Sequence, residues 1–204
     1  MKLSYIMGML ASGELANLNL AEDHVNIKPE RQLGVLRAIN AGLEDLHTRF
    51  LLKRNRVILD VLPGALEITI DEPDFIEVIE IYHNGALLSD NLYVKKTPNT
   101  IWLPYKLGML DTVSVEYKAR HKELTELDLS LDSEVDLPMS YLNALLYFVA
   151  ARLHVASVQP MDNERGEGMA YTRKFQEEIM LMSNQGIDAD SLLVPDTFRS
   201  RGFV

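Results

Sequence analysis

The chain has 204 residues, of which 47% are hydrophobic and 25% charged. This composition excludes a disordered chain, a collagen-like fibre and a small disulfide scaffold. The 30 acidic and 20 basic side chains give a formal net charge of -10. A protein that grips nucleic acid by neutralising its phosphates carries the opposite sign.

Cysteine is absent, which excludes thiol catalysis, cysteine zinc ligands and disulfides. The longest apolar run, residues 144–151, is far shorter than the roughly 20 residues that cross a bilayer. Residues 1–10 lack the long apolar core of a signal peptide. We therefore expect a soluble protein with no membrane contact.

Residues 1–55 are predicted to form the first half of a helical part. A short helix is expected from about Ser4 to Ala11. Pro29 suits the first position of a second helix, where a missing N–H costs nothing. This helix is predicted to end near Leu52, and His47 on its stripe is expected to be a hydrogen-bonded core residue. The positions on the stripe, three or four residues apart, are Leu33, Leu36, Asn40, Leu43, His47 and Phe50.

From residue 56 the apolar period changes to two, which is typical of strands. About six short strands separated by turns predict a small antiparallel sandwich or barrel over residues 56–122. Asn84-Gly85 is a strong signal for a type I′ hairpin, since both residues tolerate positive φ. The strands are expected near residues 57–61, 66–70, 75–82, 92–94, 101–103 and 113–117.

Residues 123–137 hold six acids and no base, and we expect a solvated acidic connector with some apolar anchoring. Residues 138–186 are predicted to be the second helical half: a helix apolar on nearly all sides, a polar turn at 159–168, and a fourth helix. Residues 187–204 have the pattern of an extended C-terminal arm. The fold class is therefore α+β, with antiparallel-packed helices from both ends of the chain and the strands inserted between them.

No catalytic signature occurs in the chain. No two of the five histidines are three or four residues apart, and no nucleophile elbow, Walker loop or dinucleotide fingerprint is present. His83 lies in the predicted hairpin and is expected to be exposed. Asp71, Glu72 and Asp74 flank a proline, where acids are common for local hydrogen bonding. We expect no catalytic residue, no metal site and no cofactor, and hence no enzyme.

Two helical segments and one hairpin resemble those of a known family. The first is LGVLRAINAGLEDLHTRFLLK at 33–53, preceded by Gly13-Glu14-Leu15. The second is LPMSYLNALLYFVAARLHVAS at 137–157, followed by a polar turn and YTRKFQEEI. Between them lies the hairpin VIEIYHNGALL. This order resembles the head-to-tail connector adaptors of tailed bacteriophages, including the tail tubular protein A-like adaptors and the head-completion adaptors.

The resemblance implies a structural virion protein that is assembled in the host cytoplasm. It implies a ring, typically a dodecamer, with the portal protein on one side and the next tail or nozzle protein on the other. Double-stranded DNA would pass through the lumen during packaging and ejection without specific binding. The helical part would build the ring wall.

The C-terminal arm, under this resemblance, would clasp the portal or a neighbouring subunit. Its apolar side chains need a surface to lie on, and its arginines suit ion pairs at an interface. The arm residues expected to bind are Leu192, Leu193, Val194, Phe198, Arg199, Arg201, Phe203 and Val204.

Three other functions stay open. The chain could be a head- or tail-completion protein with a different docking partner. It could be a small acid–base enzyme that uses the acids at 71–74 or the acidic connector. It could also be a nucleic-acid-binding module in which Tyr93, Trp102 and nearby lysines form a stacking platform.

Overall fold

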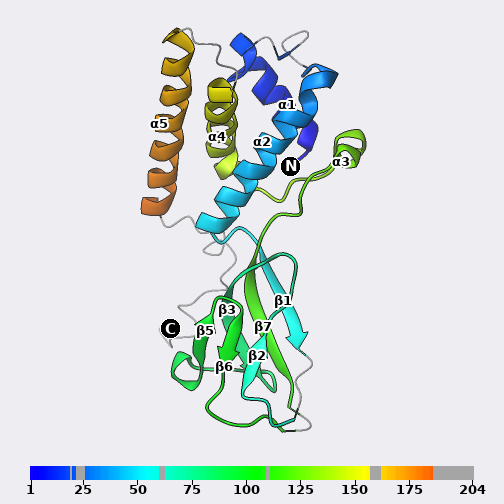
Figure 1. Ribbon diagram of the computed structural model, residues 1–204, viewed down its shortest axis with the longest axis vertical. Helices are drawn as coiled ribbons and strands as arrows, with labels where there is room; N and C mark the ends of the chain where they lie inside the picture. The colour runs from blue at the N-terminus through cyan, green and yellow to red at the C-terminus, as the bar shows by residue number, and fades with distance from the viewer. Residues whose placement is uncertain (19, 22–25, 60–62, 109–110, 157–161, 186–204) are drawn as a thin grey trace, which may run out of the picture. The chain divides into compact units, whose positions relative to one another are not determined.

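The computed structural model (Figure 1) describes residues 1–18, 20–21, 26–59, 63–108, 111–156 and 162–185. Within these ranges, the side chains of residues 156, 162–165 and 185 are left out of the description. The chain divides into two units, each with its own core. Unit 1 combines residues 1–52 with the described residues from Lys122 onward, and unit 2 is Lys53–His121. The fold is α+β, as predicted.

Unit 1 is a helical bundle made from both ends of the chain, as its colours show in Figure 1. Two 3-10 turns, Ala16–Leu18 and Met139–Tyr141, adjoin its helices. The helices are α1 (Leu3–Ser12), α2 (Pro29–Arg49), α3 (Glu126–Leu131), α4 (Leu142–Ala156) and α5 (Asp162–Gln185).

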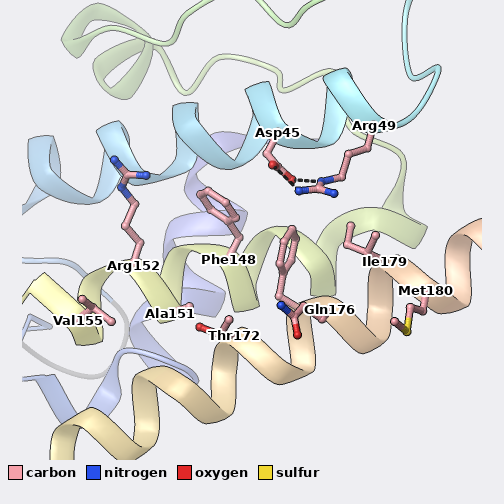
Figure 2. Close-up of a pocket in the computed structure, with 11 residues that line it drawn as sticks. Asp45, Arg49, Phe148, Ala151, Arg152, Val155, Thr172, Gln176, Ile179 and Met180 are labelled. Carbon is pink, nitrogen blue, oxygen red and sulfur yellow. Dashed lines mark hydrogen bonds and ion pairs between the residues drawn. The ribbon is translucent and has the colours of Figure 1, made fainter.

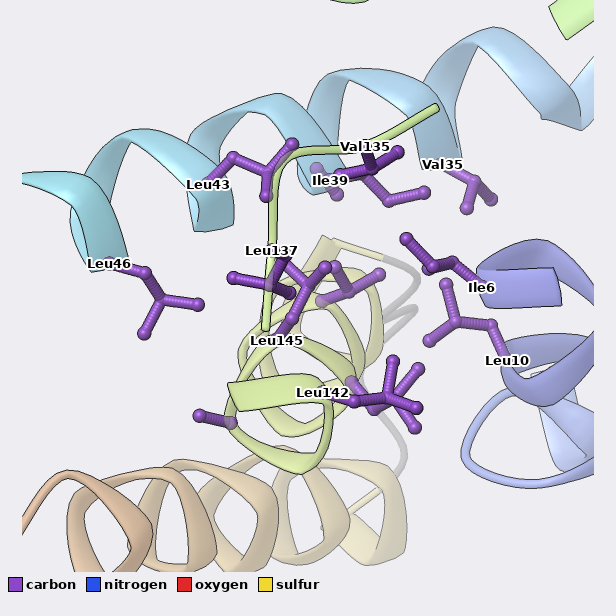
Figure 3. Packing of buried hydrophobic residues seen from close by; sticks show 14 of the residues in the cluster. Ile6, Leu10, Val35, Ile39, Leu43, Leu46, Val135, Leu137, Leu142 and Leu145 are labelled. Atoms are coloured by element: carbon purple, nitrogen blue, oxygen red, sulfur yellow. The ribbon is translucent and has the colours of Figure 1, made fainter. Parts of the chain in front are cut away.

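The core of unit 1 lies where α1, α2 and α4 meet. Gly42 lets α2 approach α4 closely: a Cβ added there would lie 2.6 Å from Leu145 Cδ1 and 3.0 Å from Phe148 Cδ1. Figure 3 shows Leu145 beside α2, while Ile6 and Leu10 of α1 close the core from another side. These side chains are almost fully buried. On the predicted stripe of the second helix, Leu36, Leu43, His47 and Phe50 are buried, Asn40 is half-buried and Leu33 is exposed, so the stripe is a core face except at its first position.

Residues 123–137 are more ordered than the connector expected from their charge. They contain α3, which begins at a capping box formed by Thr125 and Asp128. Figure 3 shows Val135 and Leu137, beyond α3, lying across the core between α1, α2 and α4. Since both are buried, this segment is part of the helical unit.

Hydrogen bonds tie this segment to both helices of the N-terminal half. The Asn40 side chain donates to the Leu124 carbonyl (2.8 Å) and accepts from the Leu124 N–H (3.0 Å). The N-terminal amine of Met1 donates to the Val135 carbonyl (2.9 Å), and the Val135 N–H donates to the Met1 carbonyl (2.7 Å). The asparagine on this mostly apolar stripe is thus explained, because it satisfies two backbone groups of a buried residue.

Unit 2 consists of two antiparallel sheets around one core, which agrees with a small sandwich. One sheet has the order β1-β7-β3-β4 and the other β2-β6-β5. Ile68 and Ile101 from the second sheet share a core with Ile81 and Val115 from the first. The strands are β1 (Arg54–Leu59), β2 (Glu67–Thr69), β3 (Phe75–His83), β4 (Ala86–Leu87), β5 (Val94–Thr97), β6 (Thr100–Trp102) and β7 (Val113–Ala119). A 3-10 turn, Asp90–Leu92, precedes β5.

The hairpin between β3 and β4 turns at Asn84 and Gly85, as predicted. Their φ angles are 51° and 81°, and a type I′ turn requires positive φ at both central positions.

Two helix boundaries differ from the prediction. The second helix was predicted to end near Leu52. It ends at Arg49, because the chain becomes extended at Phe50. The fourth helix begins at Asp162, so Gly166 and Gly168 lie inside α5 and not in a turn. Gly168 has a packing reason: a Cβ there would lie 3.1 Å from Val155 Cγ2 on α4.

A glycine-to-alanine pair on α2 tests the close approach to α4. Gly34 has no neighbour within 4 Å of an added Cβ, so Gly34→Ala should raise the free energy of unfolding by about 0.5–1 kcal/mol through helix propensity. Gly42→Ala gains the same propensity but forces a methyl against buried Leu145 and half-buried Phe148, and should lower that free energy by about 1 kcal/mol net. Urea unfolding of both variants measures this, and equal effects would contradict the packing argument.

Asn40→Ala tests the tie between α2 and Leu124. Two hydrogen bonds are lost and buried backbone groups are left without a partner, so the free energy of unfolding should fall by about 2 kcal/mol. Asn143→Ala is the matched control, because Asn143 is exposed on α4; it should change that free energy by less than about 0.5 kcal/mol. Similar losses for both variants in thermal or urea unfolding would refute the role of Asn40.

Candidate interaction surfaces

A groove of about 740 Å³ opens along α4 in unit 1, with walls from α2 and α5. Figure 2 shows Phe148 pointing into it from α4, Arg49 reaching over it from α2 and Met180 lining it from α5. We call it the α4 groove, defined by these lining residues: Asp45, Arg49, Phe148, Ala151, Arg152, Val155, Thr172, Phe175, Gln176, Ile179 and Met180.

The groove follows from the composition of α4. This helix is apolar on nearly all sides, so it offers one face to α2 and another to α5. The Phe148 and Phe175 rings meet edge to face with centroids 5.3 Å apart, which holds α5 against α4. Farther from this contact the apolar surface stays open: Val155 is 63% exposed and Met180 66%.

The polar groups of the groove give it a positive balance. Arg49 binds Asp45 through two hydrogen bonds, of 2.6 and 3.0 Å. The bond to Asp45 raises the pKa of the Arg49 guanidinium, so this group stays charged. Arg152 is exposed and makes no hydrogen bond or ion pair with the residues that the structure describes. Two arginines against one aspartate suit an acidic or neutral occupant.

A second exposed apolar surface lies on α3. Leu127 is 64% exposed and Leu131 66%, and residues four apart lie on one side of a helix. Three exposed acids lie on α3 or within a few residues of its ends: Glu123, Glu126 and Glu134. We call Leu127 and Leu131 with these acids the α3 face.

The α3 face is held in place at both ends of its short helix. At the start, Asp128 accepts from the Thr125 hydroxyl (2.7 Å) and the Thr125 N–H (2.8 Å). These bonds and one from Ser133 lower the pKa of Asp128 to about 2. At the end, Asp132 adopts the left-handed conformation and accepts from the Ser4 N–H (2.8 Å). The two leucines are therefore presented on an anchored turn.

The prediction that His83 is exposed is wrong: in unit 2 it is half-buried. Its Nε2 lies 3.3 Å from Asp111, and its Nδ1 lies 3.4 Å from the Tyr105 hydroxyl. Asp111 also accepts from the Asn84 side chain (2.9 Å) and the Gly108 N–H (2.6 Å), and these bonds lower its pKa. The cluster ties the hairpin to the chain ahead of β7.

Asp74, one of the three acids considered for acid–base work, has structural partners. Asp74 accepts from the Asn55 side chain (2.6 Å) and from the Tyr117 hydroxyl (2.8 Å). Burial, followed by the bond to Asp74, raises the pKa of Tyr117 to about 12. Asp74 thus links the turn at 71–74 to β1 and β7.

One of the two rings considered for a stacking platform, Tyr93, is not available on the surface. Tyr93 is buried, and its hydroxyl donates to Asp90 (2.8 Å). Lys95 directs its amine to the Val78 carbonyl (2.8 Å). Trp102 remains half-buried at the end of β6, so only part of its ring is available.

Two histidines of unit 1 are core residues. His47 is fully buried with Nε2 3.2 Å from the Asp136 carbonyl, which confirms its predicted place in the core. His154 is buried with Nε2 3.0 Å from the Glu14 carbonyl and Nδ1 3.4 Å from Glu167. Within the described ranges, no group of three or more histidine, aspartate or glutamate residues is arranged to hold a metal ion.

The arm residues predicted to bind the portal or a neighbour lie outside the described residues. These are Leu192, Leu193, Val194, Phe198, Arg199, Arg201, Phe203 and Val204.

No protein-family model matches the chain, and a search of curated proteins found no match. None of the helices in the described part of the chain is long and apolar enough to cross a membrane. The class that fold and surfaces define is therefore an α+β protein whose helical unit carries two exposed apolar surfaces.

No pattern in the sequence marks either surface directly. The groove combines side chains from three separate segments, so no contiguous motif marks it. The signal for the groove in the sequence was the excess of apolar positions on α4. A helix that is apolar all round has more apolar surface than two neighbouring helices cover. On α3 the signal was the capping pattern Thr125-x-x-Asp128 together with Leu127 and Leu131, which are four residues apart.

The capping box of α3 can be tested by titration. The pKa of Asp128 is about 2, below its usual 3.8. A lowered folded-state pKa stabilises the fold above the unfolded value, and this contribution is lost as the pH falls from about 4 towards 2. Thr125→Ala removes the largest cause, so the pKa of Asp128 should rise towards 3.8 in a carboxyl ¹³C titration. Thr97→Ala in unit 2 is the control; an unchanged Asp128 in Thr125→Ala would contradict the box.

Proposed function

We propose that this chain is a structural ring adaptor of a tailed-bacteriophage virion, located between the portal protein and the next tail or nozzle protein. The order of its helical segments and hairpin resembles the head-to-tail connector adaptors. The observation that carries the proposal is the pair of apolar surfaces on unit 1, the α4 groove and the α3 face. A ring of identical subunits needs two different surfaces on each subunit.

In the proposed ring, double-stranded DNA passes through the lumen during packaging and ejection without being held. The net charge of -10 supports this, because like charges oppose contact with phosphates. The proposal requires no catalytic residue and no cofactor. It places the protein in the virion, after assembly in the host cytoplasm.

The C-terminal arm, residues 187–204, is proposed to bind the portal or a neighbouring subunit. Its apolar residues, such as Leu193 and Phe198, would gain a surface to cover, and Arg199 and Arg201 would pair with acids of the partner. Ordering a segment on binding allows a large area to be wrapped.

Mixing the purified full-length chain with the portal of the same virus should give one closed ring on each portal, a dodecamer by the resemblance. Mass photometry measures the stoichiometry and negative-stain microscopy shows the ring. A chain that stays monomeric with and without the portal, and whose loss leaves tail attachment intact, would refute the proposal. Binding to another head or tail component in place of the portal would favour the completion-protein alternative.

Deleting residues 187–204 separates the role of the arm in the same assay. The truncated chain should lose portal binding while its circular dichroism and unfolding midpoint stay as in the full chain. Unchanged portal binding would refute the role of the arm and leave the ring proposal standing.

A further inference from the structure

The α4 groove and the α3 face lie on opposite sides of unit 1. In Figure 1, α3 and α5 flank the helices between them from two sides, and the groove runs along α4 beside α5. An α3 face therefore cannot reach the groove of its own chain. A contact between two different surfaces of identical molecules is heterologous, and it either closes into a ring or continues as a filament.

The two surfaces match in apolar character. Leu127 and Leu131 stand one turn apart on a short, anchored helix, and both are about two-thirds exposed. The groove offers apolar walls at Phe148, Val155 and Met180. An apolar helix face that inserts residues i and i+4 into a hydrophobic groove is a recurrent mode of recognition. The cavity of about 740 Å³ falls in the range of sites that hold a specific ligand.

The two surfaces also match in charge. Exposed acids lie on α3 or within a few residues of its ends, at Glu123, Glu126 and Glu134. The groove presents Arg49 and Arg152, of which Arg49 also binds Asp45. Complementary charges at the rim of an apolar contact set its register and speed association.

We propose that the α3 face of one copy docks in the α4 groove of the next copy, with Leu127 and Leu131 as the anchors. This deepens the proposed function and rests on its ring. Each copy offers one face and one groove, so the same contact repeats around the assembly. A stable protein interface buries about 800 Å² on each partner. The proposed contact therefore also includes surface around these two anchors.

Cross-linking tests the pairing directly, because the chain has no cysteine of its own. Leu127→Cys and Met180→Cys both replace exposed side chains. Under assembly conditions, a short bis-maleimide should join the two single variants into a heterodimer when they are mixed. A variant with both changes should give a ladder of multiples. Leu92→Cys, exposed in unit 2, is the matched control with Met180→Cys, and equal yields from the two pairs would overturn the proposal.

Charge variants test the same contact by complementation. The double variant Leu127→Asp/Leu131→Asp loses the α3 face and keeps the groove. The double variant Val155→Asp/Met180→Asp loses the groove and keeps the face. All four side chains are mostly exposed, so the fold should be retained in both. Each double variant alone should self-associate at least about tenfold more weakly than the parent chain, as expected when interface anchors are lost. An equal mixture should form dimers and nothing larger, because each pair has one intact contact.

The outcomes separate this inference from the proposed function. Full rings from both double variants would overturn the α3–groove pairing while the ring proposal stands. If the deletion of residues 187–204 and the groove variant Val155→Asp/Met180→Asp both abolish rings while Leu127→Asp/Leu131→Asp does not, the groove holds the arm of this chain and the pairing is wrong. A parent chain that stays monomeric with its portal would refute the proposed function itself.

Discussion

The close contact of α2 with α4 at Gly42 is the constraint on which the helical unit depends. The two helices are about a hundred residues apart in the sequence, and the whole of unit 2 lies between them in the chain. A side chain at Gly42 would push against Leu145 and Phe148. With no side chain there, α2 covers one face of α4, and Phe148 points from α4 towards α2 and into the groove (Figure 2), where its ring meets that of Phe175 on α5. The position of the groove is thus a consequence of this contact.

The second requirement is that the chain return from unit 2 along a fixed path. Asn40 binds both backbone groups of Leu124, and Met1 binds both backbone groups of Val135. Between these two ties the chain makes α3, whose ends are fixed by Thr125 with Asp128 and by Asp132. The exposed leucines are therefore held by hydrogen bonds to the rest of unit 1. An anchored apolar pair loses little conformational freedom on binding, which favours specific contact.

Much of the fold could be predicted from the sequence because periodicity reports burial. The stripe on α2 and the alternation in β3 and β7 predict the α+β class, and Asn84-Gly85 predicts its hairpin. The glycines of α5 led to a wrong boundary, since Gly168 serves close packing against Val155 and does not end a helix. Helix α3 was not predicted, because the six acids of residues 123–137 favoured a solvated connector. The capping box that begins α3 is a short local pattern and did not outweigh that charge. The two surfaces could not be predicted, since exposure depends on which faces the other helices leave uncovered.

The central claim is that copies of this chain assemble through the α3 face and the α4 groove. Hydrogen–deuterium exchange of the full chain, compared between its dilute and its assembled state, tests it most directly. The account predicts slower exchange on assembly in two separate stretches of unit 1: Glu126–Leu131 of α3, and the parts of α4 and α5 that line the groove. Protection confined to unit 2 or to α1, with these stretches unchanged, would contradict it.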